Sequence, residues 1–234
     1  MNKINILKFK KVLAIFAHPD DESFACAGYL RKLVNSGATV NLICATKGEK
    51  GSAGISPLCS RKELGKFRSA ELKKAGKIIG IKKIFFLGLL DGSLNKISLK
   101  TLTSYIFPIL KKYKPNLIIT FIKSGISGHP DHIQISKAVT SSFKKYQTIY
   151  PETELYYCAI PDKLMEKGKI KNNHYQRKKN KIENIDIVVN IKQELKVKIK
   201  AIKCHKTQEK DWQKFFDLLQ FQNLHYEYYV RFKK

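Results

Sequence analysis

The sequence predicts an α/β fold built around a mostly parallel sheet. Two patterns carry that prediction: short apolar, β-branched runs recur along the chain, and segments with helical spacing lie between them. The 234 residues are 43% hydrophobic and 11% aromatic, an ordinary globular composition that excludes wholesale disorder and collagen-like or coiled-coil classes. A chain of this length can bury a proper core. We therefore expect one domain over residues 1–234.

The predicted strands are the apolar runs, and they cover residues 11–17, 39–46, 83–87, 117–122, 154–159 and 186–190. The predicted helices fill the intervals and have recognisable boundaries. The first ends at Ser36-Gly37, the second at Gly80 and the third before Pro115, while the fourth follows a Gly-His-Pro turn at 128–130. With two late helices, the helical segments cover residues 22–35, 60–79, 98–113, 131–145, 191–204 and 210–219.

The chain is strongly basic, with 45 Lys and Arg against 19 Asp and Glu and a formal net charge of +26. Such a charge attracts nucleic acid or an anionic membrane surface. Only five of these residues are Arg, and the Lys accompany many Ile and Asn, which favours compositional bias over specific phosphate recognition. No RRM, KH, helix-turn-helix or zinc-finger pattern is visible, so nucleic acid is disfavoured as a partner. The dense basic stretch 167–181 is expected to be a solvated part of a surface excursion over residues 162–184.

Cysteine usage and the N-terminal residues bear on the compartment. The five cysteines contain no CxxC pair, which indicates neither a disulfide framework nor a thiolate zinc site. The only early apolar run, residues 12–17, is too short for a signal peptide or a membrane span. We expect a reduced, cytoplasmic protein.

Two His-Pro-Asp tripeptides carry the chemistry. His18-Pro19-Asp20 follows the first predicted strand, and His129-Pro130-Asp131 follows the fourth. Because ligands of open α/β sheets bind at the carboxyl ends of strands, both tripeptides are expected at one edge. Either copy alone is more simply a turn whose Asp caps a helix. Together they offer the two His and one carboxylate of an open, catalytic zinc site.

The motifs resemble those of the PIG-L/LmbE-like zinc-dependent N-deacetylases. Ala-His-Pro-Asp-Asp-Glu at 17–22 and Gly-His-Pro-Asp-His at 128–132 are the most specific features. Three further segments are similar to family motifs, at 44–51, 68–71 and 200–208. The likeness covers about residues 10–215 in the right order. It implies a three-layer Rossmann-like fold.

The resemblance also implies residue roles at the metal. His18, Asp21 and His132 match the zinc ligands, with one Zn2+ per chain, although another divalent metal such as Fe2+ remains open. Asp20 matches the general base that takes a proton from metal-bound water, which is chemically sensible because zinc lowers the pKa of that water toward 7.

Further roles follow from the same resemblance. His129 is expected to stabilise the oxyanion as a cation or to protonate the leaving amine, with Asp131 orienting its ring. Capping of the following helix is a second role open to Asp131. Glu49, Arg68 and Asp91 match substrate-binding positions. By residue type alone these three are equally ordinary surface and turn residues.

The implied activity is removal of the N-acetyl group from an N-acetylglucosamine-type sugar conjugate. This conjugate is a small molecule, and an anionic one is left open. An amidase of a larger sugar-thiol conjugate is the alternative that uses the same site. Peripheral contact with an anionic membrane and assembly into a homo-oligomer are open, since the family contains both single chains and rings.

Overall fold

The computed structural model describes residues 5–161, 164 and 185–233, and within them it contains one seven-stranded sheet in the order β3-β2-β1-β4-β5-β7-β6. The first five strands in this order are mutually parallel, and β7 is antiparallel to both β5 and β6. The mostly parallel sheet is therefore confirmed. The strands are β1 (Lys11–Phe16), β2 (Thr39–Thr46), β3 (Lys83–Leu89), β4 (Leu117–Phe121), β5 (Glu154–Ala159), β6 (Ile187–Asn190) and β7 (Tyr226–Arg231).

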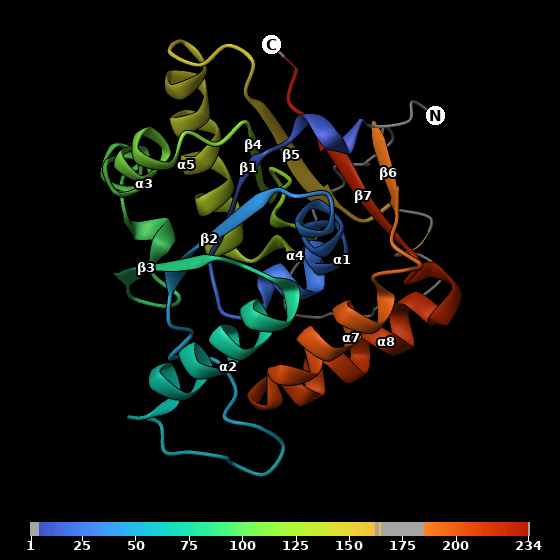
Figure 1. The fold of residues 1–234 in the computed structure, drawn as a ribbon. Coiled ribbons are helices and arrows are strands. Elements are labelled where there is room, and N and C mark those ends of the chain that lie inside the picture. Colours follow the sequence, from blue (N-terminus) through green and yellow to red (C-terminus); the bar gives the residue numbers. More distant parts are fainter. Residues whose placement is uncertain (1–4, 162–163, 165–184, 234) are drawn as a thin grey trace.

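Helices cover both faces of this sheet, which gives the three layers expected (Figure 1). One face carries α3 and α5, and the other carries α1, α2 and α7, with α8 packed beside α7. A single turn, α4, leads into α5. The helices are α1 (Asp21–Asn35), α2 (Leu64–Ile79), α3 (Leu99–Tyr113), α4 (Gly125–Gly128), α5 (Pro130–Gln147), α7 (Leu195–Cys204) and α8 (Glu209–Asn223).

The strand order reverses beside β1, and this decides where a site forms. β1 pairs with β2 on one side and with β4 on the other, and every residue of β1 after Lys11 is buried. The crossovers leave β1 and β4 in opposite directions, so a crevice opens at their carboxyl ends. Both His-Pro-Asp tripeptides emerge at that crevice.

All six predicted strands and all six predicted helices are present, with shifted ends. The seventh strand, β7, was not predicted. Its side chains alternate in burial along Tyr226–Arg231, but its hydrogen bonds run to β5 and β6, which are distant in the sequence. The predicted excursion at 162–184 lies outside the described residues except for Leu164.

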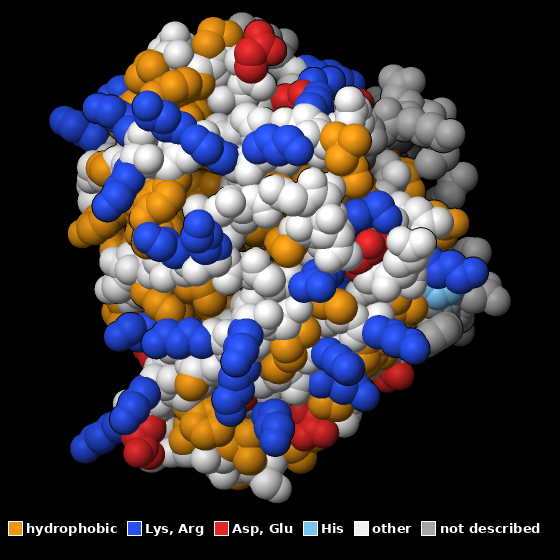
Figure 2. Space-filling model, in the orientation of Figure 1, with side chains coloured by type: hydrophobic (Ala, Val, Ile, Leu, Met, Phe, Trp, Pro, Cys, Tyr) orange, Lys and Arg blue, Asp and Glu red, His pale blue; other side chains and the backbone are white. Residues whose placement is uncertain are grey.

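The core is one cluster that includes the buried strands and the facing sides of α1, α2, α3 and α5. No helix in the described ranges is both long and apolar enough to cross a bilayer. Lys and Arg side chains are dispersed among apolar ones over the face seen in Figure 2, and they do not gather into one patch there.

Candidate metal centre

The first tripeptide ends β1 and starts α1. Asp21 is the first residue of that helix, and its Oδ2 accepts hydrogen bonds from the backbone N–H groups of Ala17 (3.1 Å) and His18 (2.7 Å). These contacts fold the strand end back over the carboxylate, so the side chains of His18 and Asp21 reach the crevice together. Both residues are more than nine-tenths buried.

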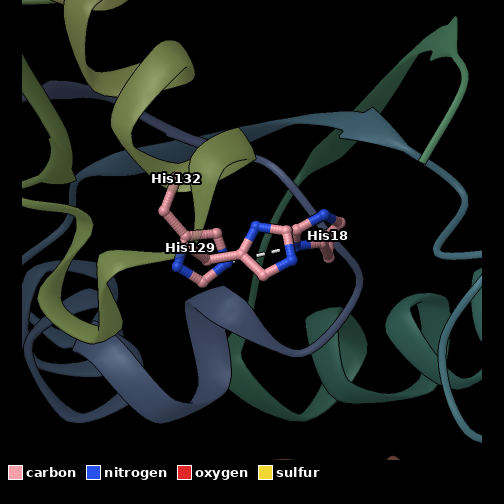
Figure 3. A group of neighbouring side chains, drawn as sticks. All are labelled: His18, His129 and His132. Atoms are coloured by element: carbon pink, nitrogen blue, oxygen red, sulfur yellow. Dashed lines mark hydrogen bonds between the residues drawn. The ribbon is translucent and has the colours of Figure 1, made fainter. Parts of the chain in front are cut away.

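The second tripeptide brings His132 to the same place, on the first turn of α5. Its ring stacks on Phe121 at the end of β4, with centroids 4.2 Å apart and planes 14° apart. Figure 3 shows the rings of His18, His129 and His132 gathered at one point, although His18 is more than a hundred residues from the others. Stacking on a buried strand holds the His132 ring in one orientation.

The ligand atoms have the spacing of a small tetrahedral metal site. His18 Nδ1 lies 3.1 Å from His132 Nε2, and Asp21 contributes Oδ1 at 3.2 Å from His132 Nε2 and Oδ2 at 3.7 Å from His18 Nδ1. Metal–ligand bonds of about 2.0–2.1 Å at tetrahedral angles separate ligand atoms by about 3.3 Å. Two nitrogens and one carboxylate therefore fit a divalent metal and leave its fourth position open.

In His18 and in His132, the second ring nitrogen makes a hydrogen bond that turns the lone pair of the first nitrogen toward the centre. His18 Nε2 lies 3.0 Å from Asp91 Oδ1 and 3.2 Å from Asp131 Oδ2, so its proton points at carboxylates. His132 Nδ1 lies 3.2 Å from the carbonyl oxygen of Gly125, which accepts its proton. Each hydrogen bond selects the tautomer whose other nitrogen is free to ligate. A Cβ at Gly125 would lie 2.8 Å from the His132 Cβ, so glycine permits this approach.

The hydrogen bonds described above also shift the pKa values of His18 and Asp21. Burial lowers the pKa of His18, but the hydrogen bonds to Asp131 and Asp91 outweigh it and raise the pKa to about 10. Burial raises the pKa of Asp21, but the neighbouring His132 outweighs it and lowers the pKa to about 2. Without a metal, His18 therefore carries an extra proton beside these carboxylates, and a divalent cation would displace that proton because a ligating imidazole must be neutral.

Asp20 stands beside these ligands in a strained backbone conformation. Its φ is +116°, which is unusual for a residue with a side chain. Its N–H donates to Glu22 Oε2 (3.2 Å), and its Oδ2 accepts from the Arg68 guanidinium (3.1 Å). Burial raises the pKa of Asp20 to about 7, with Arg68 opposing the rise. The carboxylate is thus adjacent to the ligands and has the pKa of a base that works near neutral pH.

Arg68, a predicted substrate-binding residue, is buried and makes hydrogen bonds within the protein. Its residue exposure is 3%, and its guanidinium donates to the carbonyl oxygens of Gly48 (2.8 Å) and Pro19 (2.7 Å) as well as to Asp20. A Cβ at Gly48 or Gly51 would lie within 2.4 Å of that guanidinium. The glycines of the 44–51 segment therefore provide the space for Arg68.

Asp91 and Glu49, the other two predicted substrate residues, also make internal contacts. Besides His18, Asp91 accepts the N–H of Lys50 through Oδ2 (2.9 Å), and its own N–H donates to Glu49 Oε1 (2.9 Å). Burial raises the pKa of Asp91, but the hydrogen bond to His18 contributes to an overall decrease to about 2. Asp91 therefore holds the ring of His18, and Glu49 holds the backbone of Asp91.

Asp131, which was predicted to orient His129, contacts both His18 and His129. The Asp131 carboxylate contacts His18 and accepts the N–H groups of Gly92 (2.8 Å) and Leu94 (3.0 Å). Asp131 meets His129 through its backbone, since its N–H donates to His129 Nδ1 (3.1 Å). Burial and the neighbouring His132 and His18 lower the pKa of His129 to about 4, which favours the neutral form of the ring near pH 7.

Sequence reasoning left the role of His205 open and assigned none to Glu22. His205 is fully buried, and its Nε2 lies 3.3 Å from Glu22 Oε1, on the carboxylate that also holds the Asp20 N–H. Both residues lie in motifs that the sequence analysis recognised: Glu22 ends the 17–22 motif, and His205 lies in the 200–208 segment. The contact between segments so far apart was not visible in either signal.

Comparison with known proteins identifies the family of this chain. Residues 13–143 match the PIG-L family, described as GlcNAc-PI de-N-acetylase. A probable N-acetyl-alpha-D-glucosaminyl L-malate deacetylase 2 of Bacillus anthracis is 34% identical over 57% of this chain and 59% of its own length. The protein of the same description from Bacillus subtilis is 31% identical over 84% of this chain and 82% of its own.

A solved structure shares the fold. The N,N'-diacetylchitobiose deacetylase from Pyrococcus horikoshii has a TM-score of 0.71 at 21% identity, with 96% of this chain and 84% of that chain covered. The match over more than half of the sequence establishes that this chain belongs to the PIG-L family. It spans about three-fifths of the length of the first curated relatives it matches.

Proposed function

We propose that this chain is a metal-dependent hydrolase that removes the N-acetyl group from an N-acetylglucosamine conjugate. The observation that carries the proposal is the convergence of His18 Nδ1, Asp21 and His132 Nε2 at tetrahedral spacing. Asp20 lies beside them in position to act on a water molecule. Membership of the PIG-L family and the printed descriptions of the Bacillus relatives support the amino-sugar substrate class.

For the metal we propose Zn2+, one per chain. Two imidazoles and a carboxylate with one open position are a ligand set common in catalytic zinc sites, although imidazole also suits Fe2+. When bound, such a metal polarises the amide carbonyl and lowers the pKa of coordinated water. His18, Asp21 and His132 would hold it, and Asp91 and Asp131 would orient His18 from behind.

The chain's own residues would then move protons around the amide. Asp20 accepts a proton from the attacking water, with its carboxylate held by Arg68. His129 accepts the N–H of Asp131 at Nδ1, which places the proton of the neutral ring on Nε2, and we assign this N–H to the carbonyl oxygen as negative charge develops there. The proton held by Asp20 passes to the leaving nitrogen as the C–N bond breaks, which releases acetate and a free amine.

Metal content and one carboxylate test this proposal. We expect about one zinc per purified chain, lost in His18→Ala and His132→Ala, and retained in His225→Ala, whose histidine lies outside the donor set. We expect Asp20→Asn to retain the metal and to lose roughly 10²–10⁴-fold in kcat on an N-acetylglucosaminide. A wild-type chain that binds no divalent metal and hydrolyses no N-acetylglucosaminide would refute it.

We place the reaction in the cytoplasm. All five cysteines are free thiols, and three of them are buried, as expected of a chain that folds in a reducing compartment. A periplasmic or secreted fraction that carries the activity, measured after cell fractionation, would contradict this assignment.

A further inference from the structure

A cavity of about 190 Å³ opens on one side of the metal centre. Asp21 and His132, two of the three proposed ligands, form part of its wall. The rest of the wall comes chiefly from the ends of β4 and β5, from β7 and from the helices α1, α4, α7 and α8. A group attached to an atom at the metal can therefore extend directly into this space.

The walls of the cavity are almost entirely apolar. They are formed chiefly by Phe24, Phe121, Ile126, Ile160, Phe215 and Tyr228. Phe24 and Phe215 meet edge to face, with centroids 5.1 Å apart, and join α1 to α8. Aromatic and aliphatic walls favour an occupant without hydrogen-bonding groups, since a polar group here would lose water without gaining a partner.

The charged residues on the wall already have partners. Lys198 Nζ donates to Glu227 Oε1 (2.6 Å) and to the carbonyl oxygen of Phe24 (3.0 Å). Glu227 also accepts from the N–H groups of Gly28 and Tyr29 and from the Tyr229 hydroxyl. Both side chains are about 4% exposed or less. The ion pair is therefore internally satisfied and does not provide a free charge for a polar ligand.

Backbone strain marks the cavity wall. Ile126 has φ +60° and ψ −63°, in a region that β-branched residues rarely adopt. The preceding residue, Gly125, provides the carbonyl that holds His132. A strained backbone conformation of this kind persists only where the surrounding structure holds it in place, and such conformations cluster at ligand sites.

The two ends of an amide substrate differ in polarity, and so do the two sides of the centre. The loops after β2 and β3 carry Glu49 and Asp91 and face His18, whereas the cavity lies on the side of β4, β5 and β7. On the first side, Glu49 Oε2 has no hydrogen-bond partner among the described residues, which suits a sugar hydroxyl there. The acyl half of the amide matches the second.

We infer that this cavity is a binding site for an unbranched, apolar N-acyl group of about six carbons. The protein then hydrolyses N-acyl glucosamine conjugates whose acyl group is longer than acetyl. A dry apolar cavity of about 150 Å³ accommodates benzene, which sets the size of the occupant. The methyl group of an acetyl leaves most of the space empty. This inference rests on the proposed hydrolase function and extends it to the acyl group.

A chain-length series tests the inference. The substrates are glucosamine conjugates with one aglycone and N-acetyl, N-butyryl, N-hexanoyl or N-decanoyl groups. We expect kcat/KM to rise about fourfold per buried methylene up to hexanoyl and to fall for decanoyl. A 5-hydroxypentanoyl substrate of similar length is expected to lose this gain. If acetyl is the best substrate and each methylene slows the reaction, the inference is wrong while the hydrolase proposal stands.

A matched pair of variants locates the effect. Ala25→Leu adds bulk on the α1 wall and is expected to lower the hexanoyl-to-acetyl ratio of kcat/KM about tenfold or more. Ala70→Leu makes the same change on the exposed surface of α2, outside the cavity lining, and is expected to leave the ratio unchanged. Equal ratios in wild type and Ala25→Leu would contradict the assignment of the cavity.

Binding without turnover separates the two proposals. In protein stripped of metal by a chelator, we expect N-hexanoyl-glucosamine to raise Tm and N-acetylglucosamine to leave it unchanged. This result would support the acyl site even if no substrate were hydrolysed. The absence of any difference between the two ligands would overturn it.

Discussion

At the scale of single residues, Asp20 depends on its neighbours for both position and charge. The Arg68 guanidinium lies 3.1 Å from its carboxylate, and Glu22 holds its N–H in a left-handed conformation. His205 lies behind Glu22. The proposed base is therefore fixed by contacts that reach it from α2 and from the region after α7.

Replacing Arg68 provides a pH test. Burial raises the pKa of Asp20, and the positive charge of Arg68 opposes that rise. Arg68→Met removes the opposing charge, so the pKa rises further. Because a base acts in its deprotonated form, the acid limb of kcat/KM moves to higher pH. We expect a loss of roughly tenfold at about pH 6 and a smaller loss at about pH 9.

Arg31→Met, which changes an arginine on α1 away from Asp20, is the control and is expected to leave the profile in place. Circular dichroism checks that Arg68→Met remains folded. An acid limb unchanged by Arg68→Met would show that Arg68 does not tune Asp20.

At the scale of elements, β7 stabilises α1 through the side chain of Glu227. The helix is interrupted at Cys26, whose φ and ψ are −153° and 15°, and just beyond it the N–H groups of Gly28 and Tyr29 donate to Glu227. The strand thus satisfies polar groups at an irregularity in the helix that starts at the proposed metal centre.

Removing Glu227 tests this support. Glu227→Ala leaves the buried Lys198 ammonium without its carboxylate and also frees two N–H groups, so we expect a loss of about 3–5 kcal/mol in the free energy of unfolding, measured with urea. The exposed pair of Lys233 with Asp186 is the comparison: Lys233→Ala is expected to cost no more than about 1 kcal/mol. Similar losses in both variants would contradict this account of β7.

At the scale of the whole molecule, the charge of +26 modifies the proposed function and does not define it. The positive side chains are scattered over the face in Figure 2 rather than gathered at one groove there. A diffuse positive field still raises the local concentration of anionic small molecules.

Salt dependence tests the role of this charge. For an N-acylglucosaminide with an anionic aglycone such as malate, we expect KM to rise several-fold between about 0.02 and 0.3 M salt with kcat little changed, because salt screens the long-range field. A neutral inositol aglycone is the control, and its KM is expected to stay constant. The same response from both substrates would assign the Lys excess to composition alone.

Much of the architecture was predictable because it depends on local patterns. Apolar runs identified six of the seven strands, and glycine and proline placed several helix ends. β7 escaped prediction because its pairing with β5 and β6 is non-local. The internal contacts of Arg68 and Asp91 were not predicted for a related reason: an arginine or an aspartate in a motif does not show whether it faces solvent, substrate or another side chain.

The sequence by itself determined the α/β fold, the family and the identity of the candidate ligands, because paired His-Pro-Asp tripeptides after strands are visible in one dimension. Only the tertiary structure decided which nitrogens of His18 and His132 face the centre, that Asp131 contacts His18, that the pKa of His129 is lowered and that an apolar cavity adjoins the centre. These properties depend on distances between segments that meet only when the sheet forms, and on the burial that sets their charge.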